Sequence, residues 1–127
     1  MAVPSGTGTE VLRGGWWNTQ STNDTSFAFD ASNPTLGDET DTVPTNHIIT
    51  MIMAGWCETG NAAETFHFWG TFDSKTVYLL RQYPLGAYDT FIWNTKFVLI
   101  GGDNLKTVTV GGADVDVFYT YLDQSWA

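Results

Sequence analysis

The chain is built from short segments rich in Val, Ile, Thr, Phe, Tyr and Trp, and Gly, Asp or Asn separates most of them. No stretch places apolar residues at the i, i+3, i+4 and i+7 spacing of an amphipathic helix. β-branched and aromatic residues favour strands, because they pack well on a pleated surface. The sequence therefore predicts an all-β fold, with strands at about 10–17, 25–29, 46–57, 64–72, 75–82, 89–93, 95–101, 104–110 and 114–122.

Three connections carry the residues that tight turns require. Asp73-Ser74 lies between two strand-like segments, and Gly101-Gly102-Asp103-Asn104 and Gly111-Gly112 follow later in the chain. Gly, Asn and Asp tolerate the positive φ angles of hairpin turns. These connections predict that the last third of the chain is an antiparallel meander.

Two predicted strands are apolar on both faces. Segments 48–54 (IITMIMA) and 97–100 (FVLI) carry apolar side chains at odd and even positions alike. Side chains alternate between the two faces of a strand, so both faces of these strands must be covered. One face is expected to meet a second sheet. The other is covered either by the irregular acidic stretch 30–44, with its prolines and glycine, or by another subunit.

Length and charge narrow the class of protein. With 127 residues, 43% of them hydrophobic, the chain fits one folded domain. We expect an antiparallel, jelly-roll-like β-sandwich at 10–127, preceded by an extended arm at 1–9 that is rich in Gly and Thr. Fourteen acidic and five basic residues give a net charge of −9, which disfavours nucleic acid and anionic membranes as partners. No secretory leader and no membrane-spanning segment is expected.

No residue pattern typical of catalysis or of metal binding stands out. His47 and His67 each lie within a predicted strand, and Cys57, next to Trp56, is expected to be buried and unreactive. Asp114 and Asp116, like the acids at 38–41, are interpreted as solvated surface charges, because neither group has the spacing of a glycosidase pair or a calcium loop. The sequence predicts no enzyme, no catalytic residue, no metal and no cofactor.

Six tryptophans leave a sugar-binding function open. Aromatic rings can stack on sugars, although in a sandwich they more often pack in the core or anchor a protein interface.

Three segments carry a resemblance to a known group of proteins. They are PSGTGTEVLR at 4–13, TFIWNTKFVL at 90–99 with the GGDNL that begins at Gly101, and ADVDVFYTYLDQSW at 113–126. Together they resemble small virion proteins of tailed bacteriophages, in particular capsid decoration (cement) proteins. Residues 18–75 contribute nothing to this resemblance.

The resemblance implies a homotrimeric β-sandwich that is made in the host cytoplasm, sits on the outside of an assembled capsid, and binds the major capsid protein without catalysing a reaction. A tail or fibre component and a carbohydrate-binding module are the alternatives, with a jelly-roll enzyme the least favoured. The candidate capsid-contact arm comprises Val3, Pro4, Ser5, Gly6, Thr7, Gly8, Thr9, Glu10 and Val11. Candidates for the subunit interface or the core are Ile48, Ile52, Trp56, Tyr119, Tyr121 and Trp126.

Overall fold

The computed structural model describes residues 9–18, 20, 24–29, 42–110 and 114–126. The secondary structure of this part is all β, which confirms the predicted fold class, and none of its residues forms a helix that would be long and apolar enough to cross a membrane. The strands are β1 (Thr9–Trp17), β2 (Thr25–Ser26), β3 (His47–Glu58), β4 (Glu64–Phe72), β5 (Lys75–Leu85), β6 (Thr90–Trp93), β7 (Phe97–Ile100), β8 (Asn104–Val110) and β9 (Val115–Ser125).

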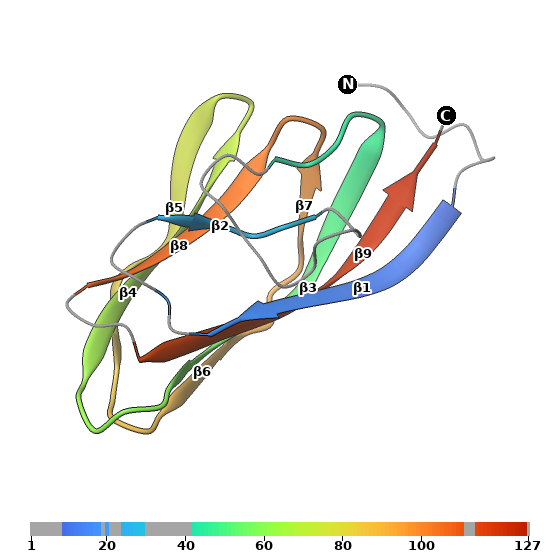
Figure 1. Cartoon of the computed structure of the whole chain (residues 1–127). Helices are drawn as coiled ribbons and strands as arrows, with labels where there is room; N and C mark the ends of the chain where they lie inside the picture. Colours follow the sequence, from blue (N-terminus) through green and yellow to red (C-terminus); the bar gives the residue numbers. More distant parts are fainter. Residues whose placement is uncertain (1–8, 19, 21–23, 30–41, 111–113, 127) are drawn as a thin grey trace.

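The strands form two antiparallel sheets that pack face to face (Figure 1). One sheet has the order β1-β9-β3-β6, and the other has the order β2-β8-β4-β5. β7 pairs with the first part of β3 and β6 with the second, so β6 and β7 together act as one interrupted strand. With β6 and β7 counted as one strand, β1 pairs with β9, β2 with β8, β3 with β6 and β7, and β4 with β5. This is the strand order of a jelly roll.

The predicted meander in the last third is wrong. β7 belongs to the sheet of β1, β8 belongs to the other sheet, and β9 returns to the first. The Gly101-Gly102 connection therefore crosses between sheets, and Gly102, at φ 91°, takes the positive φ expected there. Turn chemistry predicts that the chain reverses, but it does not decide with which strand the next segment pairs.

The first strand begins one residue earlier than predicted. Thr9, expected to end the arm at 1–9, lies in β1 and pairs with Ser125 of β9. Glu10 and Val11, which are also candidate capsid-contact residues, lie in the predicted strand and pair with Gln124 and Asp123. Threonine favours strands, so Thr9 extends β1 along the edge that β9 offers. The rest of the expected arm, 1–8, lies outside the described residues, as does 30–41 of the acidic stretch.

The core is a continuous aromatic cluster between the two sheets. Trp56 of β3 is fully buried and stacks on Phe66 of β4, with ring centroids 4.6 Å apart. Its indole Nε1 donates a hydrogen bond to Thr107 Oγ1 of β8 at 3.0 Å. Phe27 lies edge-on to Tyr119 at 4.9 Å. The two sheets are therefore joined by ring contacts and by a hydrogen bond that satisfies the buried indole.

Candidate functional site

The outer face of the β1-β9-β3-β6 sheet, which points away from the core, carries many apolar side chains. In β9 the odd-numbered residues from Val115 to Asp123 are buried and the even-numbered ones are half-exposed, so the latter face outward. Strand pairing then places the partners of the even-numbered residues on the same side. The apolar residues on this side, which we call the apolar face, are Leu12, Trp16, Ile48, Met53, Ile92, Val98, Ile100, Phe118 and Leu122. Thr50, Thr90, Thr120 and Gln124 lie among them.

Several of these side chains are open to solvent. The exposed fractions are 64% for Leu12, 54% for Trp16, 42% for Ile92 and 53% for Val98. The remaining members are half-buried, because they lie against each other across the strands. Contiguous exposed apolar surface on a folded domain typically marks an interaction site.

The apolar face is flattened near its centre. Phe118 of β9 lies opposite Gly55 of β3, and a Cβ atom built on Gly55 would lie 2.2 Å from Cζ of the Phe118 ring. The ring therefore rests directly on the backbone of β3, which only glycine permits. Side chains laid flat in this way give a smooth surface that another protein can cover closely.

A hollow of about 150 Å³ opens at one corner of the apolar face. It lies where β3 begins and where β7 and β9 end, and Ile48 and Ile100 belong to both the hollow and the apolar face. Its full lining is Thr45, Asn46, His47, Ile48, Ile100, Gly101 and Trp126. A hollow of this size, continuous with an apolar surface, can receive one protruding side chain of a bound protein.

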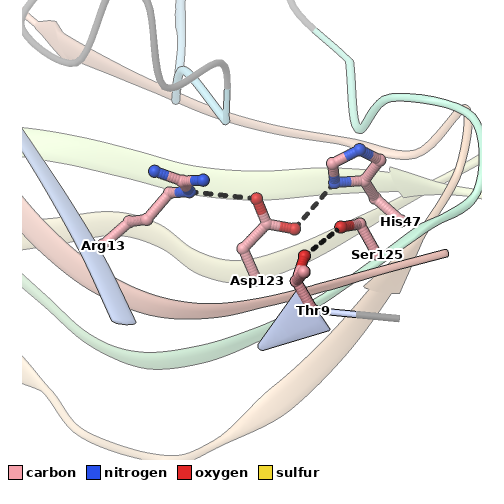
Figure 2. A network of polar contacts seen from close by, with 5 residues as sticks. All are labelled: Thr9, Arg13, His47, Asp123 and Ser125. Atoms are coloured by element: carbon pink, nitrogen blue, oxygen red, sulfur yellow. Dashed lines mark hydrogen bonds and ion pairs between the residues drawn. The ribbon is translucent and has the colours of Figure 1, made fainter. Parts of the chain in front are cut away.

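A polar network ties the three strands together beside this corner (Figure 2). Asp123 of β9 is 4% exposed, and its Oδ2 accepts a hydrogen bond from Arg13 Nε of β1 at 3.1 Å. Its Oδ1 lies 2.7 Å from Nδ1 of His47 at the start of β3. Each carboxylate oxygen thus has its own partner, as a buried charge requires. The network fixes β1 and β3 to β9 at the end where β1 begins.

Each of the two histidines has a hydrogen-bond partner among the described residues. His47 bonds Asp123, and Nδ1 of His67 accepts a hydrogen bond from the backbone N–H of Gln82 at 3.1 Å. Cys57 is half-buried on β3, not fully buried as predicted, because it lies opposite Asp116 on the outward side of the sheet. In the described ranges, no three His, Cys, Asp or Glu side chains are grouped as metal ligands.

The structure divides the predicted interface-or-core residues into two groups. Trp56, Tyr119 and Tyr121 are core residues, at most 3% exposed. Ile48 and Trp126 line the hollow, and Ile52 is half-buried at a register shift between Met51 and Met53. Sequence reasoning missed Leu12, Trp16 and Ile92 as surface apolar residues. The adjacent apolar pairs Val11-Leu12 and Trp16-Trp17 contained a signal, because neighbouring residues of a strand point to opposite faces. Sequence reasoning also missed the Asp123 network, whose members are far apart in the sequence.

An acidic group lies at the opposite end of β3. Glu58 is fully buried, and its Oε1 accepts a hydrogen bond from the backbone N–H of Gly60 at 2.8 Å. Its Oε2 is buried and has no hydrogen-bond partner in the described part of the chain. Glu64 is 8% exposed, and burial raises its pKa above the usual 4.5, helped by the negative charges of Glu58 and Asp114. Folding therefore makes Glu64 easier to protonate than it is in the unfolded chain.

We expect this group to make stability depend on pH. Glu64 binds its proton more tightly in the folded than in the unfolded chain, so the free energy of unfolding falls as pH rises from the unfolded value of 4.5 through the raised folded pKa. Glu64→Gln should remove this loss and unfold at a higher urea concentration than the wild type at pH 7, but not at pH 4. Glu10→Gln, at an exposed position, serves as the control. Equal pH dependence of Glu64→Gln and wild type would contradict the assignment.

A comparison with known protein families finds no match, and a comparison with curated proteins finds no similar sequence.

Proposed function

We propose that the chain is a non-catalytic structural protein that works by covering protein surfaces, as a decoration protein on the outside of a tailed-phage capsid. The observation that carries this proposal is the apolar face. Leu12, Trp16 and Val98 are exposed to water, and burial of these side chains under another protein lowers the free energy of the system. The jelly-roll strand order is compatible with this role, since viral capsid domains use it, but lectin domains use it too.

The charge pattern of the face supports a protein as the partner. The residues of the apolar face are uncharged, while the carboxylates on the same side, Glu10 and Asp116, lie toward the two ends of β9. An uncharged centre with charges at the periphery is typical of protein interfaces. In a chain with net charge −9, an uncharged face is also the surface on which two copies can meet with least repulsion.

The size of the face is sufficient for a stable contact. β9 has 11 residues, and four strand positions spaced about 4.8 Å apart give a flat area on the order of 700 Å². A standard protein interface buries about 800 Å² on each partner. We propose that the chain forms a homotrimer in which the apolar face of each copy packs on a different patch of the next copy, as a closed ring requires. We further propose that segment 3–11 contacts the major capsid protein.

The test of this proposal is attachment to capsids. Purified protein should bind capsids that lack it in a saturable manner, with a fixed number of copies per capsid. Removal of residues 1–8 should weaken this attachment at least tenfold and leave the unfolding midpoint unchanged, because these residues precede the paired part of β1. Sedimentation of capsids with bound protein measures the occupancy. Unchanged occupancy after truncation would contradict the role of this segment, and binding to glycans but not to capsids would favour a carbohydrate-binding module.

A further inference from the structure

β5 forms a free edge of the second sheet. The order β2-β8-β4-β5 ends at β5, whose strand partner in the described chain is β4. In Figure 1, β5 (yellow) lies on the opposite side of the molecule from β1 (blue). A strand at the edge of a sheet presents backbone N–H and C=O groups that another chain can pair with. The free edge of β5 is thus separate from the apolar face.

The hairpin turn shows which backbone groups are available. Asp73 and Ser74 have φ angles of 51° and 64°, as in the two-residue type I′ turn that joins β4 to β5. In such a hairpin the closing pair, Phe72 and Lys75, exchanges both hydrogen bonds, and the pairs then alternate. The register is regular from Phe72 back to Trp69, opposite Tyr78. Thr76 and Tyr78 therefore direct their N–H and C=O groups away from β4, toward the free edge.

The side chains of β5 give this edge a positive charge. β5 contains Lys75 and Arg81 and no Asp or Glu. The guanidinium carbon of Arg81 lies 4.9 Å from the centre of the Tyr78 ring, a cation–π contact that restrains the guanidinium. In the described ranges, the ion pairs join Asp123 to Arg13 and His47, so neither Lys75 nor Arg81 has a carboxylate partner there. Two cations on one edge with no carboxylate partner among the described residues are unexpected in a chain with net charge −9.

Positive charge on an edge strand also has a protective effect. Cations and prolines on edges keep like chains from pairing, and β5 ends with Gln82 at φ 50° and with Pro84, both of which interrupt a regular edge. The protection is selective, however. It repels a second copy of β5, whereas it attracts a strand that carries carboxylates.

We propose that the β5 edge binds an extended acidic segment of another protein, which adds to the sheet as a further strand. Its backbone pairs with Thr76 and Tyr78. One of its carboxylates contacts Arg81 on the face of the sheet that carries Tyr78, and another, at a position that points to the opposite face, contacts Lys75. Strand addition of this kind takes affinity from backbone hydrogen bonds and specificity from side chains. Because the guanidinium is held on Tyr78, less of its freedom is lost when it binds a carboxylate through two N–H groups.

The test uses a blocked six-residue peptide with threonine at each end and four glutamates between, titrated into the full-length protein and followed by amide NMR shifts. Consecutive glutamates present carboxylates to both faces of the sheet. We expect saturable shifts that concentrate on residues 75–81, and an affinity that falls as salt is added. Two probes separate the contributions. The same peptide with lysine in place of glutamate tests charge, and the acidic peptide N-methylated at alternate residues tests backbone pairing. Both should bind at least tenfold more weakly.

Three variants complete the test. Arg81→Glu removes the restrained cation, and Thr76→Pro removes an N–H that β4 does not use. Each should weaken binding at least tenfold, whereas Lys96→Glu, an exposed cation between β6 and β7, should not. Wild-type affinity in Arg81→Glu, or equal affinity for the N-methylated peptide, would overturn the proposal. The absence of peptide binding would also overturn the proposal. So would a higher affinity for polyglucuronate, an acidic polysaccharide, than for the peptide at the edge that carries Arg81.

Discussion

Trp56→Ala is expected to lower the free energy of unfolding by about 3–5 kcal/mol, the usual cost of removing a buried tryptophan. The side chain is fully buried, stacks on Phe66 and meets Phe68 edge-on with ring centroids 4.8 Å apart. The substitution also leaves Thr107 without the indole N–H that it accepts at 3.0 Å. Single domains are stable by about 5–15 kcal/mol, so this one change removes a large part of the total.

Urea denaturation followed by circular dichroism, at a protein concentration low enough to keep the chain monomeric, measures this effect. Trp16→Ala is the matched control, because Trp16 is 54% exposed on the apolar face and its loss should change the unfolding free energy of the monomer by less than about 0.5 kcal/mol. Trp56→Phe should fall between wild type and Trp56→Ala. Similar unfolding midpoints for Trp56→Ala and Trp16→Ala would show that the aromatic cluster does not hold the two sheets together.

Val98→Glu is expected to weaken self-association at least 100-fold, equivalent to about 2.7 kcal/mol. Val98 lies on β7 within the apolar face, and a carboxylate there must lose its water when another subunit covers it. The folded monomer should tolerate the change, because the Val98 side chain is 53% exposed. Analytical ultracentrifugation over a range of protein concentrations measures the dissociation constant.

Val110→Glu provides the matched comparison for this variant. Val110 is 51% exposed and ends β8, on the outward side of the other sheet. Both variants replace a half-exposed valine on a strand by the same acid, so they differ mainly in which sheet carries the new charge. If Val110→Glu weakens association as much as Val98→Glu does, the effect comes from added net charge and not from the apolar face.

The strand positions were predictable because they depend on local residue type and alternation. β3 and β7 illustrate this point. Their apolar residues at odd and even positions indicated that both faces of the strands must be covered. In the structure Ile49, Met51 and Leu99 point into the core, while Ile48 and Val98 lie on the outward face. The second apolar side of these strands, inferred from the sequence, thus corresponds to part of the apolar face that we propose as the protein-binding surface.

The pairing of strands and the polar network were not predictable in the same way. β8 follows β7 after a glycine-rich turn and yet joins the other sheet, because pairing is decided by contacts between residues far apart in the chain. Asp123 likewise meets Arg13 and His47, 110 and 76 residues away. A single sequence carries no local signal for such contacts, so Asp123 was indistinguishable from the surface acids.

Hydroxyl-radical footprinting tests most directly whether the apolar face is a protein-binding surface. The labelling of the monomeric chain is compared with that of the chain assembled on capsids. We expect Leu12, Trp16, Ile92 and Val98 to be labelled in the monomer and protected in the assembly, while Val110 and Tyr88, 68% exposed, react equally in both. Equal labelling of the four apolar-face residues in the two states would contradict the account.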